Sequence, residues 1–305
     1  MQNKLKKITI LVLFFFSLCF SLSGGDVEFP LVQSMSYFPY FDNRPLQKNS
    51  FSLSADMNYS NIFMFDSKKT TVNDMELFSN ILAIRYGLLD SLTLELYYRA
   101  SYVHGGSFDN FVMSFHEKYS MPVAGRDEYP LDSVHYSLKD YFSYNEKTVA
   151  PSSLLLAAAV DIYRSKNINL KGRAGFGLPL LTKPGFSSDK PFANAGLVFF
   201  ARKGIFALDL SAYLSFYKAP EWLEDEEIKS NIFTYQLEGT VYRFFMGYRY
   251  RSTPFTEGDL AHHGYQLYVG WRIGKLLEIA LVEDFGPFDT TPDVGFNLKI
   301  NLLKK

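Results

Sequence analysis

The feature that most constrains this chain is a two-residue alternation of apolar with polar side chains, which recurs in segment after segment. Between Phe206 and Phe216 every second residue is apolar, whereas Asp209 and Ser215 lie in the other row. Successive side chains of a β-strand point to opposite faces, so this period predicts strands with one apolar and one polar face. About twelve strands are predicted, at 49–64, 71–86, 91–104, 151–164, 167–179, 192–202, 204–217, 230–240, 242–253, 264–273, 276–284 and 293–303.

The connections between these segments alternate between short and long. The short ones fall near 87–90, 165–166, 202–204, 240–241 and 274–275, and the long ones at 66–70, 104–150, 180–191, 218–229, 252–263 and 284–292. Short periplasmic turns and long outer loops are typical of outer-membrane barrels, whereas a soluble sandwich does not require this alternation. The fold class predicted is an all-β, transmembrane, antiparallel up-and-down barrel of about 12 strands (range 10–14).

The distribution of charge predicts which row faces lipid. In each strand one row is nearly free of charge, and the other carries the charged residues. An Arg or Lys on the lipid face costs about 2–4 kcal/mol at the midplane, and about fifteen such costs would exceed the 5–15 kcal/mol stability of an ordinary domain. The charged row must therefore face a polar lumen. Its predicted pore-lining members are Arg85, Glu95, Arg99, Asp161, Arg173, Asp209, Glu238, Arg243, Arg249, Arg251 and Arg272, with Asp56, Lys171, Glu278 and Lys299 in the same row.

Aromatic residues make up 17% of the chain, and many tyrosines lie near predicted strand ends. Tyrosine is enriched where a membrane meets water, so these residues are predicted to form interfacial girdles rather than a soluble core. They are Tyr59, Tyr86, Tyr98, Tyr102, Tyr163, Tyr217 and Tyr242.

The first residues have the pattern of a secretory signal peptide. Lys4, Lys6 and Lys7 precede an apolar run over 8–22, and small residues follow at 23–25. A membrane anchor is the alternative, but the run is short for a spanning helix of about 20 apolar residues. The predicted organisation is a signal peptide at 1–25, an N-terminal periplasmic or plug segment at 26–48, and the barrel at 49–305.

Composition excludes several classes of protein. The net charge of −1 offers no basic footprint for nucleic acid, and a mean hydropathy of −0.06 is too polar for a bundle of membrane helices. The single cysteine, Cys19, lies in the predicted signal peptide. Thiol catalysis and cysteine-based zinc sites are therefore excluded, and no cofactor is expected.

The long connection 104–150 holds the most distinctive residues. Phe108, Phe111, Phe115 and Tyr119 recur at helical spacing, which predicts an amphipathic helix at 107–119. The helix is interpreted equally well as a lid or plug over the pore and as a surface helix on the rim. A site formed by His104, Asp109 and His116 would use the residue types of metal or acid–base centres. Their spacing matches no known ligand pattern, so a structural role, in which Gly105 and Gly106 supply a turn, is the favoured hypothesis.

Several blocks together resemble a known family. They are Asn58–Phe63, Ile84–Asp90, His104–Phe111, Ser114–His116, Met121–Pro122 and Gly125–Arg126. The sequence is similar over roughly 50–130 to the bacterial domain-of-unknown-function family 3187, whose members look like outer-membrane β-barrels. The resemblance implies a fold and no activity. Its most specific part is the loop motif His104, Gly105, Gly106, Asp109, His116, Gly125 and Arg126.

These observations predict a protein of the bacterial outer membrane that is not an enzyme. The predicted lumen row has nine cations against six anions, and Arg or Lys rings favour anions. The function expected is a narrow, porin-like channel for small polar solutes, anionic ones included. The alternatives are a plugged structural or surface barrel, and an outer-membrane hydrolase with His104 or His116 as base. The expected partners are outer-membrane lipid, the barrel-assembly machinery and a small polar solute; nucleic acid is not expected, and the chain is expected to be a monomer.

Overall fold

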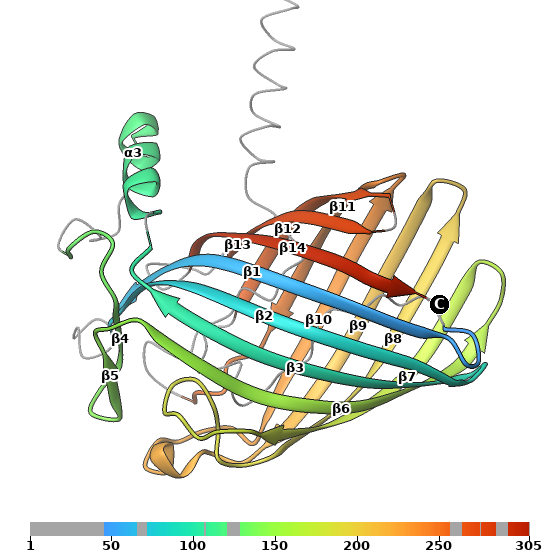
Figure 1. Ribbon diagram of the computed structural model, residues 1–305, viewed down its shortest axis with the longest axis horizontal. Helices are drawn as coiled ribbons and strands as arrows, with labels where there is room; N and C mark the ends of the chain where they lie inside the picture. The colour runs from blue at the N-terminus through green and yellow to red at the C-terminus, as the bar shows by residue number, and fades with distance from the viewer. Residues whose placement is uncertain are drawn as a thin grey trace, which may run out of the picture.

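Twelve long strands close into an antiparallel barrel (Figure 1). The computed structural model describes residues 46–65, 72–106, 108–120, 129–256, 264–274, 276–284 and 292–304. The barrel strands are β1 (Phe51–Phe65), β2 (Val72–Leu89), β3 (Leu92–His104), β6 (Thr148–Arg164), β7 (Ile168–Pro179), β8 (Phe192–Lys203), β9 (Phe206–Tyr217), β10 (Asn231–Val241), β11 (Phe244–Arg251), β12 (Gly264–Ile273), β13 (Leu277–Asp284) and β14 (Pro292–Lys304). Each falls on a segment whose alternation predicts a strand, so the up-and-down barrel is confirmed.

Strand pairing closes the barrel without a free edge. Each strand pairs with the next barrel strand along the chain, and β1 pairs with both β2 and β14. Because Ser52 lies opposite Lys304, the start of β1 and the end of β14 lie at the same rim. Figure 1 places the C-terminus at the end with short turns, which corresponds to the periplasmic end of an outer-membrane barrel. The long loops lie at the opposite, outer rim.

Two further elements belong to the connection between β3 and β6. The helix α3 (Asp109–Tyr119) confirms the predicted helix. The hairpin of β4 (His135–Leu138) and β5 (Phe142–Tyr144) was not predicted, because its strands are too short to show a period. It extends the sheet at the outer end of β2, where Asn73 lies opposite Tyr136. Another outer loop holds a 3-10 turn, η2 (Glu221–Leu223).

The outer face of the wall is an apolar band. Outward rows carry large exposed hydrophobic side chains on nearly every strand: Leu82, Leu94, Leu156, Phe176, Leu197, Leu210, Leu237, Met246, Trp271, Ile279 and Phe296. In water such a surface would drive aggregation, whereas lipid covers it without cost. A closed barrel with this band is a protein of the outer membrane. Among the described residues, no helix is both long and apolar enough to cross a bilayer.

The predicted tyrosine girdle is correct in part. Tyr86, Tyr98, Tyr163 and Tyr242 are 38%, 38%, 55% and 64% exposed on the outer surface. The prediction is wrong for Tyr217, which is buried. Tyr217 lies an even number of residues from Asp209, so it belongs to the inward row of β9. The alternation in the sequence had therefore already placed it on the lumen side.

The chain reaches β1 from inside the periplasmic rim. The predicted signal peptide and residues 26–45 lie outside the described residues, but Leu46 is buried and Gln47 packs against Gly87. Gly87 is in the inward row of β2, and a Cβ there would lie 2.0 Å from the carbonyl oxygen of Gln47. Glycine at this position therefore lets the entering segment lie against the inner wall. Asn49 and Gly87 then join the segment to β2 by a 2.7 Å backbone hydrogen bond.

Candidate functional site: the lumen and its outer mouth

The strand register brings opposite charges together on the inner wall. Arg85 lies directly opposite Glu95, and Asp161 directly opposite Lys171. Directly opposed residues of one face are close enough for their side chains to interact, so the register itself decides which charges pair. The predicted lumen residues thus form local clusters rather than one continuous ring.

The first cluster is centred on Glu95. Its carboxylate accepts hydrogen bonds from Arg85 Nε at 3.3 Å and from Arg173 Nε at 2.5 Å. The Arg173 guanidinium also lies 5.4 Å from the centre of the Tyr97 ring. All four side chains are at most 5% exposed, so this part of the lumen is filled.

A second cluster surrounds Arg272, which is half-buried. Its guanidinium donates to Glu238 at 2.7 Å, to Glu278 at 3.2 Å and to Thr240 at 2.9 Å. Glu278 is in turn opposite Lys299. The pairing continues to Asp56, which is opposite Lys299 on the next strand. Charges of alternating sign therefore follow four neighbouring strands around the wall.

Two further inward arginines also bind neutral side chains. Arg249 donates to Gln236 at 3.0 Å and to Gln266 at 3.4 Å. Arg99 donates to Ser79 at 3.2 Å and to Ser101 at 3.3 Å. Buried Arg251, Asp209 and half-buried Asp161 complete the inward set.

Arg243 was predicted to line the lumen, but it does not. It lies with Tyr242 in the turn between β10 and β11 and is exposed, with its guanidinium 5.1 Å from the centre of the Tyr242 ring. Tyr242 has φ +59°, so the chain reverses there and β11 begins at Phe244. In the sequence, the alternation of β11 continues past the end of the strand, and this is why Arg243 was assigned to the lumen row. Without Arg243, the predicted set of lumen residues has eight cations against six anions.

Glycines on the inner wall hold aromatic rings flat against it, a feature that the sequence analysis missed. Gly247 lies opposite Tyr268 and Gly270 opposite Phe245. A Cβ at Gly247 would lie 2.3 Å from the Tyr268 ring, and one at Gly270 would lie 2.2 Å from the Phe245 ring. The same arrangement joins Gly177 with Phe192 and Gly196 with Tyr213. Glycine inside a strand often marks a close approach of this kind, so the glycines within the predicted strands were the sequence signal for this feature.

An aromatic cluster covers the outer end of the inner wall. This mouth cluster comprises Tyr136, Phe142, Tyr144, Phe186 and Trp222, from the β4–β5 hairpin, the β7–β8 loop and η2. The ring centres of Tyr136 and Phe186 are 5.0 Å apart, and those of Phe142 and Trp222 are 5.9 Å apart. Three separate outer loops therefore meet in one cluster.

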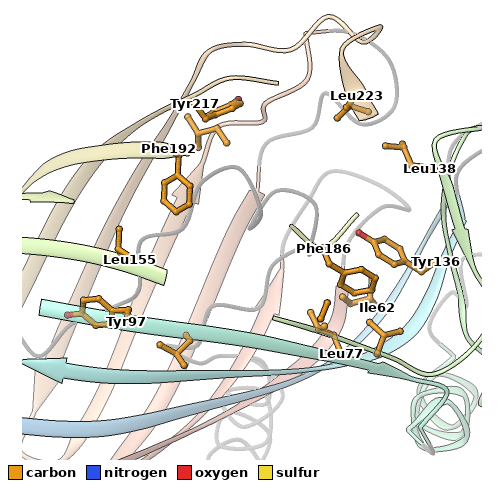
Figure 2. Packing of buried hydrophobic residues seen from close by; sticks show 14 of the residues in the cluster. Ile62, Leu77, Tyr97, Tyr136, Leu138, Leu155, Phe186, Phe192, Tyr217 and Leu223 are labelled. Carbon is orange, nitrogen blue, oxygen red and sulfur yellow. The ribbon is translucent and has the colours of Figure 1, made fainter. Parts of the chain in front are cut away.

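The mouth cluster rests on inward-facing wall residues. Figure 2 shows Phe186 and Tyr136 beside Ile62 and Leu77, which belong to the outer ends of β1 and β2. Ile62 and Leu77 are at most 1% exposed. The loops thus fold inward, and they place an apolar layer above the charged part of the lumen.

Polar contacts tie the same loops together at their surface. Lys190 donates to Asp189 at 3.0 Å and to Glu221 at 2.6 Å, and the Glu221 backbone N–H donates to Asp189 at 3.0 Å. The hydrogen bonds to Glu221 and Asp189 raise the pKa of Lys190. Burial raises the pKa of Asp189, but the bonds from Lys190 and from the Glu221 backbone outweigh it and lower the pKa overall.

The loop motif fastens the start of the long connection to the rim. A Cβ at Gly105 would lie 1.8 Å from the Asp132 carbonyl oxygen, and Gly106, with φ +65°, lies against the Glu76 carboxylate. Asp109 accepts from Asn61 Nδ2 and from the Asp132 backbone N–H, both at 2.8 Å. Gly125 and Arg126 lie outside the described residues.

The two histidines of the motif do not build a lumen site. His104 ends β3 in its outward row and stacks on Tyr102, with ring centres 5.0 Å apart. Both carboxylate oxygens of Asp109 accept from Asn61 and Asp132. Within the part of the chain that the structure describes, no three His, Cys, Asp or Glu side chains gather in a way that could hold a metal ion.

Comparison with known proteins places this geometry among outer-membrane barrels. The family described as "Protein of unknown function (DUF3187)" matches residues 29–196, more than half of the chain. The COG4313 outer membrane channel from Pseudomonas putida F1 has a TM-score of 0.55 at 14% identity, over 86% of this chain and 98% of that one. That similarity shows a shared fold.

Two other solved structures are more distant. The KdgM porin has a TM-score of 0.43 at 7% identity, over 82% of this chain and 99% of that one. Outer membrane phospholipase A from Escherichia coli has a TM-score of 0.42 at 11% identity, over 90% and 98%. No curated protein sequence matches the chain.

Proposed function

The chain belongs to the DUF3187 family, and we propose that it is a narrow outer-membrane channel for small polar solutes, anionic ones included. The observation that carries the proposal is the inner wall itself. Its inward row is charged along the barrel, and the predicted lumen residues other than Arg243 are eight Arg or Lys against six Asp or Glu. Rings and ladders of Arg and Lys favour anionic solutes.

Stability alone does not explain why the inner wall carries charged side chains. Buried ion pairs can often be replaced by apolar side chains of similar volume without loss of stability, because desolvation offsets their attraction. A barrel selected only to hold its shape could therefore fill its lumen with apolar residues, as the mouth cluster does locally. A charged wall retained beneath that cluster fits a path for polar solutes.

The mouth cluster is the constriction of the proposed channel. Most of it comes from the connection 104–150, because the β4–β5 hairpin of that connection supplies three of the five rings. The helix of the same connection does not belong to the cluster. Opening would require the hairpin and the β7–β8 loop to separate from Ile62 and Leu77.

A plugged structural barrel is the second candidate, and one observation favours it. Most inward charged residues are less than 10% exposed and hydrogen-bonded to one another, beneath an apolar layer. The hydrolase alternative has no comparable support, because His104 packs on the outer face of the wall.

Planar-bilayer conductance of the refolded protein distinguishes the two candidates. We expect small discrete openings, a reversal potential under a salt gradient that indicates anion preference, and larger or more frequent openings in Phe186→Ser. In Arg249→Gln/Arg251→Gln the anion preference should fall. Arg243→Gln, in the exposed turn between β10 and β11, is the control.

One result would contradict the channel, and a second would contradict only the role of the arginine pair. Silence of both the wild type and Phe186→Ser, with each protein shown to be folded by its heat-modifiable mobility, would favour the plugged barrel. Openings without any effect of the Arg249→Gln/Arg251→Gln change would keep the channel and remove the arginine pair as its selectivity element.

A further inference from the structure

The helix α3 carries an exposed aromatic stripe that the channel does not use. Phe111 and Tyr119 are each 57% exposed and Phe115 is 38% exposed, although all three are large rings. The rings follow one another along the helix, with centres 6.3 Å apart from Phe111 to Phe115 and 4.7 Å apart from Phe115 to Tyr119. We propose that α3 lies in the outer surface of the membrane and inserts this stripe into the outer-leaflet lipid.

The stripe continues directly from the lipid-facing wall. Phe108 precedes the helix, and its ring centre is 5.1 Å from that of Phe111. The same Phe108 ring packs on Phe296 at 5.4 Å and on Tyr59 at 6.0 Å, which lie in the outward rows of β14 and β1. The apolar band that lipid covers thus runs without interruption from the barrel onto the helix.

The first turn of α3 is anchored, so the stripe cannot turn away from lipid. Val112 is 3% exposed and Asp109 is 2% exposed. Asp109 is bonded to Asn61 on β1 and to the backbone of Asp132. Because two residues of the first turn are held in place, the rotation of the helix about its axis is fixed, and with it the direction in which the aromatic rings point.

Other occupants of the stripe are less well supported. As a lid, the helix would have to reach the mouth, but the mouth is already covered by the mouth cluster, and Figure 1 shows α3 standing apart from the β4–β5 hairpin. A helix with one apolar face and one polar face suits the boundary between acyl chains and headgroups, where aromatic side chains are enriched.

Site-directed fluorescence tests the proposal in the full chain. In a Cys19→Ser background, single cysteines replace Phe115 on the stripe or Glu117 on the opposite side, and each is labelled with the fluorophore NBD. The proteins are refolded into phosphatidylcholine vesicles with or without brominated acyl chains. We expect a blue-shifted emission and several-fold stronger bromine quenching at position 115 than at position 117.

The design separates the other outcomes. Equal quenching at both positions, or none at 115, overturns the proposal. Self-quenching at 115 that disappears when labelled protein is diluted with unlabelled protein indicates docking on a second copy, which also overturns it. Both positions are exposed, so neither change should prevent folding; heat-modifiable mobility checks this, and Tyr119 with Asn110 forms a second pair on opposite sides of the helix.

Discussion

The Arg173 guanidinium on β7 reaches Glu95 on β3, with Nε and Oε2 2.5 Å apart, although β6 lies between their strands. The contact is possible because β6 presents small side chains inward at this level. Ala157 lies opposite Glu95, and Ala159 lies opposite Arg173. Two alanines therefore create the space in which the charged cluster of the lumen forms.

Glu95→Gln is expected to destabilise the barrel strongly. The change leaves Arg85 and Arg173 buried without their shared counter-charge, and breaking a buried ion pair in this way costs about 3–5 kcal/mol. Urea unfolding in lipid vesicles measures the loss. Removing both partners in Glu95→Gln/Arg173→Met should cost less than the sum of the single changes, and additivity of the two single changes would count against the pair.

The sequence predicted the barrel well because the period of two and the charged row report the same geometry. Each barrel strand has one apolar row that lipid covers and one charged row that must avoid lipid. Both rows can be recognised within the sequence of a single strand. The residues missed depend on neighbours distant in sequence. Arg243 continues the alternation of β11 but lies in a turn, and the partnership of Gly247 with Tyr268 exists only across strands.

The candidate site was predictable in composition and not in arrangement. The two-residue alternation along each strand shows which charged residues face inward. The contact of Arg173 with Glu95, in contrast, depends on the register of three strands. The mouth cluster was missed for the same reason. Its rings come from three loops with no period, and only the folded loops bring Tyr136 to Phe186.

Gly105→Ala is expected to release the long connection from the rim while the barrel stays folded. The new Cβ would lie 1.8 Å from the Asp132 carbonyl oxygen, a backbone atom that cannot move without displacing the loop. Limited proteolysis should therefore cut the 104–134 region faster, with unchanged heat-modifiable mobility. Gly264→Ala is the control, since neither Gly105 nor Gly264 has a positive φ and the nearest atom to the Gly264 Cβ position, Arg251 Cβ, is 4.0 Å away.

The contacts between the outer loops should weaken in acid. Because Lys190 and the Glu221 backbone hold the pKa of Asp189 below its usual 3.8, the stabilisation is present above that value and is lost as the pH falls through the lowered pKa. In Trp271→Phe, Trp222 is the remaining tryptophan and lies beside Glu221. Its fluorescence should shift below about pH 4. An identical transition in Asp189→Asn would assign the shift to another group.

Gly247→Ala is expected to destabilise the barrel by about 1–3 kcal/mol, the usual cost of overpacking. The added methyl group would lie 2.3 Å from the Tyr268 ring, so the ring must leave the wall and give up its 2.5 Å hydrogen bond with Gln236. Urea unfolding in vesicles measures the effect. Gly239→Ala on β10 is the matched control, because the nearest atom to its Cβ position is 4.0 Å away. This change should be neutral or slightly stabilising, since alanine restricts the unfolded chain more than glycine does. Equal losses in the two variants would mean that strand glycine itself matters, and that Tyr268 does not need the space.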